Sequence, residues 1–189
     1  WETVMGSTPE GQTESEGLYP VTMINYEDIT KEGGFLDKLN TMCADQLPAG
    51  MQFALATEAE WHYAASGGRK SQGYIYAGSN TISDVAWYAD NAGGTSHFVA
   101  SRQPNELGLY DLSGNVWEYC NDWYADLADI PADQGTDYVG PDSGKVIVGC
   151  GGCYSSEPYT CTSSYHGREI EHNGRNATVG FRIVLRRIN

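Results

Sequence analysis

Cysteine and histidine side chains are the residues of this sequence with the clearest potential for metal or redox chemistry. Cys150 and Cys153 have the C-x-x-C spacing that occurs in redox motifs and in zinc sites. A zinc site needs further ligands, and no second C-x-x-C supplies them, while a thioredoxin-like motif needs a βαβ context that is missing here. The spacing alone therefore does not favour a working C-x-x-C site. The odd cysteine count predicts at least one unpaired thiol among Cys43, Cys120, Cys150, Cys153 and Cys161.

The four histidines form neither an H-x-H nor an H-x-x-x-H pair. A non-haem iron centre of the facial-triad type needs two histidines and a carboxylate that converge. No G-x-S-x-G nucleophile motif and no phosphate-binding loop occurs either. We therefore interpret the histidines as ordinary surface or capping residues; they are His62, His97, His166 and His172.

The charge balance restricts the possible partners. With 25 acidic and 11 basic residues, the chain carries a net charge of −14. Such a field repels a phosphate backbone, so we expect no nucleic-acid partner, and it disfavours an anionic membrane surface. The same carboxylates are suitable ligands for Ca²⁺. No apolar run approaches the ~18 residues of a membrane-spanning helix, and no signal-peptide pattern is present, so the sequence gives no direct indication of compartment.

The elements that would position these groups are short. A helical pattern covers residues 26–42, with Asn25 or Asp28 as a cap and a glycine pair at 33–34 that can interrupt it. A second helix begins after Thr57, which forms a capping box with Glu60, and ends at the glycines 67–68. Short apolar runs separated by Gly, Asn, Asp and Pro follow, and residues 179–188 read as one half-buried strand. These features predict one α+β domain over residues 1–189.

Several segments together carry a family likeness. Residues 56–65 read ATEAEWHYAA, residues 105–119 read NELGLYDLSGNVWEY, and Gly151-Gly152 is followed by Gly180-Phe181-Arg182. These segments resemble motifs of the sulfatase-modifying-factor family, which includes formylglycine-generating enzymes, and the early residues 1–7 are similar too. The resemblance covers nearly the whole chain. It implies a C-type-lectin-like fold of the formylglycine-generating-enzyme type, with few helices, short antiparallel strands and long loops.

The central motif suggests a calcium site. In the resembled family, an acidic or amide side chain, two main-chain carbonyls and a glutamate of this motif bind Ca²⁺, and these positions correspond to Asp111, Gly114, Val116 and Glu118. Oxygen ligands from a tight loop suit Ca²⁺, although four ligands leave part of its usual shell of 6–8 to be supplied. The alternative is that Asp111 and Glu118 instead accept hydrogen bonds from main-chain N–H groups.

Catalysis by the family's copper route is not expected. Formylglycine-generating enzymes hold copper with two cysteines, because soft thiolates select Cu(I). The resemblance places the corresponding positions at Ser156 and Cys161, so the pair is incomplete and we do not expect copper. A shifted pair of Cys153 and Cys161 remains the alternative catalytic site, for a copper or non-haem iron oxidase acting on cysteine-containing substrates. Cys150 also stands where the family has an arginine.

The C-terminal segment 150–178 is rich in Cys, Tyr, Ser, Glu, Thr, His, Arg and Asn. This composition resembles the variable region of diversity-generating retroelement proteins, which vary surface positions of the same fold and keep Gly-Phe-Arg. We expect a non-catalytic protein that binds a protein or cell-surface ligand, at a cell surface, outside the cell or on a phage particle. Tyrosine and serine also suit adaptable contact surfaces. The expected ligand contacts are Tyr154, Ser155, Glu157, Tyr159, His166, Arg168, Glu169, Glu171, His172 and Asn173.

Overall fold

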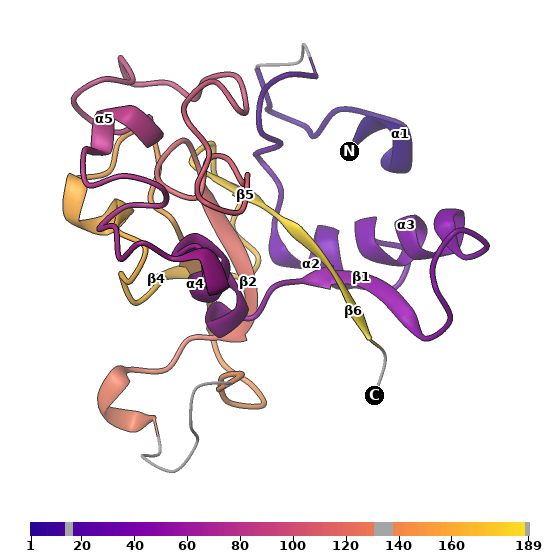
Figure 1. Cartoon of the computed structure of the whole chain (residues 1–189). Helices are drawn as coiled ribbons and strands as arrows, with labels where there is room; N and C mark the ends of the chain where they lie inside the picture. The colour runs from indigo at the N-terminus through magenta and orange to yellow at the C-terminus, as the bar shows by residue number, and fades with distance from the viewer. Residues whose placement is uncertain (14–16, 131–137, 188–189) are drawn as a thin grey trace.

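The computed structural model describes residues 1–13, 17–130 and 138–187. Short helices occupy mainly the first half of the chain and most strands the second, and long irregular segments connect them (Figure 1). The α+β class with few helices, short strands and long loops is therefore confirmed. The helical elements are α1 (Glu2–Met5), α2 (Tyr26–Thr30), α3 (Phe35–Cys43), α4 (Glu58–Ala65), η1 (Gly68–Lys70), α5 (Ile82–Val85), η2 (Leu127–Asp129) and η3 (Pro158–Cys161).

The helical pattern at residues 26–42 forms two helices rather than one. Asn25 caps α2 and forms a capping box with Asp28, so both candidate residues take part. The helix cannot continue through the glycine pair, because Gly33 has a φ of 72°. Gly34 then begins α3, and a Cβ on Gly34 would lie 2.8 Å from the carbonyl oxygen of Lys31.

Helix α4 follows its expected start. The Thr57 hydroxyl accepts a hydrogen bond from the Glu60 N–H at 3.1 Å, and the Glu60 carboxylate accepts one from the Thr57 N–H at 2.9 Å. Asp122 adds a third cap contact by accepting a hydrogen bond from the Glu58 N–H at 2.8 Å. The first turn of α4 is therefore held in place against strand β2 (Trp117–Trp123).

The strands form two sheets. A four-stranded sheet has the order β4-β3-β2-β5, in which β2–β3 and β3–β4 are antiparallel and β2–β5 is parallel. A two-stranded sheet pairs β1 with β6 in antiparallel fashion, and α3 lies beside it (Figure 1). The remaining strands are β1 (Met51–Leu55), β3 (Val146–Cys150), β4 (Arg168–Glu171), β5 (Val179–Phe181) and β6 (Ile183–Arg187).

The single strand expected at residues 179–188 is wrong. The segment divides at Arg182: β5 extends the four-stranded sheet beside β2, whereas β6 pairs with β1 in the other sheet. Arg182 leaves both ladders, and its side chain turns toward Glu118 of β2. An alternation of apolar residues predicts which face is buried, but it does not show that the chain changes sheets halfway.

The core lies where the helices cover the four-stranded sheet. One cluster contains Trp117 and Tyr119 of β2, and another contains Trp61 of α4, all nearly inaccessible to solvent. Trp87 and Trp123 are only partly buried. No helix among the described residues is long and apolar enough to cross a membrane.

Candidate functional site

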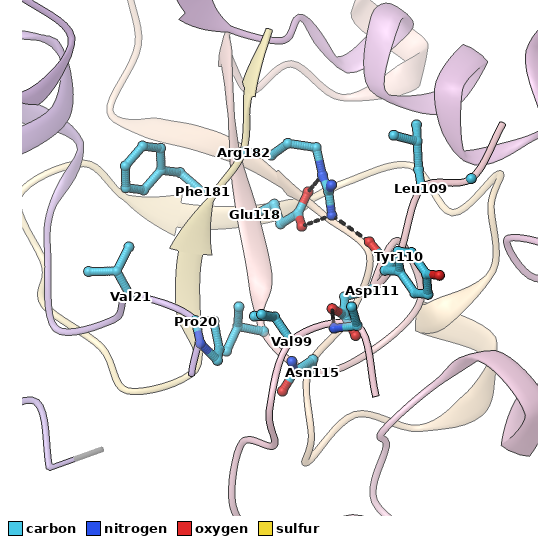
Figure 2. A pocket seen from close by; sticks show the side chains of 13 residues that line it. Pro20, Val21, Val99, Leu109, Tyr110, Asp111, Asn115, Glu118, Phe181 and Arg182 are labelled. Atoms are coloured by element: carbon cyan, nitrogen blue, oxygen red, sulfur yellow. Dashed lines mark hydrogen bonds and ion pairs between the residues drawn. The ribbon is translucent and has the colours of Figure 1, made fainter. Parts of the chain in front are cut away.

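The central motif is organised around one guanidinium group. Arg182 donates to Glu118 Oε2 from Nε at 2.9 Å and to Glu118 Oε1 from its terminal nitrogen at 2.7 Å. Trp61 also donates to Oε2 from Nε1 at 2.8 Å. The same terminal nitrogen of Arg182 donates to the Tyr110 carbonyl at 2.7 Å (Figure 2). Both carboxylate oxygens of Glu118 are thus engaged by positively polarised N–H groups.

A cavity of about 340 Å³ opens beside this group (Figure 2). Three of its non-glycine lining residues, Ala100, Asp111 and Asn115, have positive φ angles of 57°, 59° and 65°. Asp111 Oδ2 accepts a hydrogen bond from the Ala100 N–H at 2.7 Å, which holds two of these unusual conformations together. Such backbone conformations persist only where the surroundings impose them. The cavity is therefore a rigid feature of the fold.

The calcium expectation can be compared with this arrangement. Asp111, Val116 and Glu118 all line the cavity, so the structure brings these expected ligands together. Burial is the main cause that raises the Asp111 pKa, and the Glu118 charge adds to it, against Ala100 and Arg182, which lower it. Because Arg182 already supplies the positive charge beside Glu118, the set fits an arginine-centred cluster better than a calcium cage. Calcium at these positions stays a prediction.

The same motif holds the start of the C-terminal segment. The Gly114 N–H donates to the Gly151 carbonyl at 2.7 Å, and the Tyr154 N–H donates to the Asn115 carbonyl at 2.8 Å. Asn115 is buried, and its side chain exchanges two hydrogen bonds with the main chain of His97. Residues 150–156 therefore leave strand β3 in a fixed direction, set by the turn that precedes β2.

Most of the expected ligand contacts are accessible. Tyr154 is half-buried. Tyr159 is 65% exposed and stands on η3, and strand β4 presents its polar residues outward while Ile170 faces the core. Expected contacts that are exposed are Ser155, Glu157, Tyr159, Arg168, Glu169, Glu171 and Asn173.

Two expected contacts differ from this pattern. His166 is half-buried, with Nδ1 2.9 Å from a Glu58 oxygen and Nε2 3.1 Å from the Ala125 carbonyl. His172 is also half-buried, packs edge-on against Trp123, and contacts the Lys145 carbonyl. Both imidazoles therefore make their contacts within the protein. Polar composition alone did not distinguish them from the exposed side chains of the same segment.

A second cavity, of about 420 Å³, lies almost wholly in the C-terminal segment. Strand β4 forms one wall and the loop that returns to β5 forms the other. Arg168, Glu169 and Glu171, which the sequence predicts as ligand contacts, line it. Arg175 and Asn176 line it as well and are not among the predicted contacts. Because these two belong to the same polar run, the signal that could have found them was present in the composition.

Aromatic and cationic groups connect the exposed part of this segment with the core. The rings of Tyr159 and Tyr165 lie 6.0 Å apart, and those of Tyr165 and Trp117 lie 6.2 Å apart. The guanidinium of Arg168 stands 5.8 Å from the Trp117 ring. This row gives the surface a rigid aromatic base, and Tyr165 in it was not among the expected contacts.

The cysteines are all free thiols, and the C-x-x-C pair does not act as a unit. Cys150 and Cys153 belong to different core clusters, and Cys150 lies instead beside Cys120. Cys153 and Cys161 are both buried, and Ser156 donates a hydrogen bond to the Cys153 sulfur at 3.3 Å. Burial, and then the nearby Cys153, raise the pKa of Cys161 to about 12. These two thiols are therefore enclosed by the fold.

The chain is similar to several known proteins. It is 34% identical to a formylglycine-generating enzyme of Streptomyces coelicolor over 189 residues, covering 89% of this chain and 52% of that protein. It is 35% identical to the chaperone protein LppX of Paenibacillus barcinonensis over 149 residues, covering 70% of this chain and 49% of that protein. The chain thus spans about half the length of these relatives.

Among solved structures, variable protein 1 of Treponema denticola superposes with a TM-score of 0.80 at 29% identity, over 99% of this chain and 80% of that protein. Residues 1–187 match the family described as the sulfatase-modifying factor enzyme 1-like domain. Both resemblances stated from the sequence are therefore confirmed. The chain belongs to the sulfatase-modifying factor enzyme 1-like domain family.

Proposed function

We propose that this protein is a non-catalytic recognition protein that binds a ligand through its C-terminal segment, residues 150–178. The observation that carries the proposal is the cavity of about 420 Å³ between β4 and the loop before β5. Exposed polar side chains surround it, and the scaffold beneath them is held by the buried turn at Gly114 and Asn115.

The chemistry of this surface favours a polar protein ligand. Arg168 stands beside Glu169 and Glu171 around the cavity, so the surface offers both charges at close range. Arg175 also lines the cavity, but its guanidinium is held by an ion pair with Asp28 at 2.6 Å. Tyr159 adds a large exposed ring at low entropic cost. Mixed charges with an aromatic anchor are typical of specific protein interfaces, in which complementary charges set the register.

The likeness to a variable protein supports diversification of this segment. The superposition with variable protein 1 of Treponema denticola extends over nearly the whole chain. Strand β4 buries Ile170 and exposes its three polar residues, so these exposed positions can change without disturbing the core. Gly180 could not change in the same way, because a Cβ there would lie 2.6 Å from the Val21 carbonyl oxygen.

We further infer that the protein acts at a cell surface, outside the cell or on a phage particle, where a recognition surface can meet foreign ligands. In this proposal, calcium at Asp111 and Glu118 stabilises the scaffold and does not contact the ligand. Calorimetric titration with Ca²⁺ checks it, with Asp111→Ala as the variant that should abolish any heat of binding, because alanine removes the side-chain oxygen ligand.

Sequence variation gives the first test. In related isolates, differences should concentrate in adenine-containing codons of residues 150–178, while Gly180, Phe181 and Arg182 stay constant. A template repeat and a reverse transcriptase gene should lie close to this gene. Differences spread evenly along the chain, without such a repeat, would contradict diversification.

Ligand binding gives the second test. Wild-type protein is screened against a panel of cell-surface proteins, and each hit is measured by surface plasmon resonance. Tyr159→Ala and Arg168→Ala should weaken binding at least tenfold. Tyr63→Ala is the matched control, because Tyr63 is 56% exposed but lies on α4, outside the segment. Equal loss from all three variants would place the contact surface elsewhere.

A further inference from the structure

A second group of reactive side chains lies away from the recognition surface, where α4 packs against β2 and β3. Glu58 and His62 are one turn apart on α4 and project from the same side of the helix. Cys150 ends β3, and Cys120 stands on the neighbouring strand β2. Helix and sheet thus bring a carboxylate, an imidazole and two thiols to one place.

The distances within this group have the scale of a metal centre. Ligand atoms of Glu58, His62 and Cys150 all lie within 4.8 Å of one another, the one such group of three or more found among the described residues. His62 Nε2 is 3.4 Å from a Glu58 oxygen. Cys120 is not a member of this group of three, but its sulfur lies 3.6 Å from that of Cys150, where it is placed to supply a fourth ligand. In a tetrahedral zinc site, ligands at 2.0–2.1 Å lie about 3.4 Å from each other and two sulfurs at 2.3 Å lie about 3.8 Å apart.

The surrounding contacts orient these groups. His62 Nδ1 lies 2.8 Å from the Ser163 carbonyl, so a proton on Nδ1 leaves Nε2 free to face Glu58 and Cys150. The Gly167 N–H donates to Glu58 Oε1 at 2.8 Å, and His166 contacts the same oxygen. Such outer contacts, with the second imidazole nitrogen on a carbonyl, are characteristic of metal-binding histidines.

The group is also reachable from solvent on one side. A cavity of about 320 Å³ is lined by Glu58, His62 and His166, whereas Cys120 and Cys150 are fully buried behind them. An ion can therefore enter from this cavity, pass Glu58 and His62, and reach the two cysteine sulfurs last. Four protein ligands would close its coordination shell, which is the arrangement of a structural rather than a catalytic zinc site.

We propose that Glu58, His62, Cys120 and Cys150 bind one divalent transition-metal ion of the zinc class. The two cysteines bind as thiolates, and their displaced protons pass to solvent. Two sulfur ligands with one nitrogen and one oxygen select Zn²⁺ over Ca²⁺ or Mg²⁺, which prefer oxygen alone. The ion ties α4 to β2 and β3, next to the polypeptide at Ser163 and Gly167 that leads into β4.

Metal content is the direct test. Protein is purified under reducing conditions, stripped of metal and supplied with Zn²⁺. After desalting it should retain one zinc ion per chain, measured by inductively coupled plasma mass spectrometry. Cys150→Ser and Cys120→Ser should lose this ion. Cys43→Ser is the matched control, because Cys43 lies at the end of α3, outside the group, and should keep it. The proposal is overturned if the wild type retains no zinc, or if both Cys150→Ser and Cys120→Ser retain it.

A measurement on the unaltered protein covers the case in which the variants fail to fold. X-ray absorption at the zinc edge should show two sulfurs at about 2.3 Å and two nitrogen or oxygen ligands at about 2.0–2.1 Å. Cobalt in place of zinc should give thiolate-to-metal charge-transfer bands. A shell of oxygen and nitrogen alone overturns the site. A Cys120–Cys150 disulfide also overturns the site if the protein takes up no metal once that disulfide is reduced. Loss of zinc in Cys161→Ser overturns it too.

Discussion

At the scale of single residues, the turn before β2 depends on a glycine that tolerates no side chain. Gly114 has a φ of 78°, and a Cβ there would lie 2.2 Å from the Trp87 carbonyl oxygen. Gly108 has nearly the same φ, 79°, but nothing lies within 4 Å of its Cβ position. The two positions therefore separate backbone strain from steric exclusion.

Substitution at these glycines should show the difference. Gly108→Ala should cost about 1–2 kcal/mol of unfolding free energy, the strain of a left-handed conformation. Gly114→Ala adds a backbone clash and should cost more than 4 kcal/mol, or prevent folding. Chemical denaturation followed by tryptophan fluorescence measures both. Equal losses would mean that the Trp87 main chain moves away freely.

The Cys161 thiol should be almost unreactive in the folded protein. Its pKa is raised from 9.0 to about 12, first by burial and then by Cys153. At any pH below 9, the thiolate fraction is therefore about a thousandfold smaller than for an ordinary thiol, and only the thiolate reacts. Alkylation with iodoacetamide at pH 8, read by peptide mass spectrometry, should label Cys43 first and Cys161 only after unfolding. Fast labelling of native Cys161, or its binding of Cu(I), would restore the oxidase alternative.

At the scale of elements, the Arg182–Glu118 pair joins β2 to the point where the chain passes from β5 to β6. Glu118 is 8% exposed and Arg182 28%. Removing one partner of such a pair leaves a charge poorly compensated, so Glu118→Gln should cost about 3 kcal/mol or more. Glu60→Gln is the matched control: the Glu60–Arg186 pair is more exposed, and glutamine keeps the capping box. The control should lose less than about 1 kcal/mol.

Thermal and urea unfolding of both variants measure this contrast. Similar losses in the two variants would show that the Arg182 guanidinium finds enough water or other acceptors, such as the Tyr110 carbonyl, to replace the lost charge.

The elements themselves show what sequence can predict. The capping box at Thr57 and the choice of Asn25 or Asp28 as a cap could be predicted, because a cap is a contact between residues three positions apart. The division of residues 179–188 at Arg182 was not, because it depends on a partner 64 residues earlier in the chain. The metal group was missed for a similar reason. Glu58 and His62 have helical spacing that could have been noticed, but Cys120 and Cys150 meet them only through the sheet.

At the scale of the whole molecule, scaffold and recognition surface should be separable in stability. Tyr159 and Arg168 are exposed, and they make no hydrogen bond among those found to the buried turn at Gly114. Tyr159→Ala and Arg168→Ala should therefore change the unfolding free energy by about 0.5 kcal/mol or less. Differential scanning calorimetry measures this. A large loss in both would show that these side chains support the core, and would weaken the recognition proposal.

Metal removal should affect the molecule as a whole. If zinc joins α4 to β2 and β3, it binds only the folded chain, and the stabilisation at a free zinc concentration of 100 times Kd is about 2.7 kcal/mol. A chelator should then lower the unfolding temperature of wild type and increase hydrogen exchange in α4 and at residues 162–167, next to the Ser163 and Gly167 contacts. Cys150→Ser should show no response to the chelator, because it has no ion to lose. An equal response in that variant would assign the effect to another ion, such as calcium at Asp111. A return of stability with Zn²⁺ but not with Ca²⁺ would identify the metal that holds the scaffold under the recognition surface.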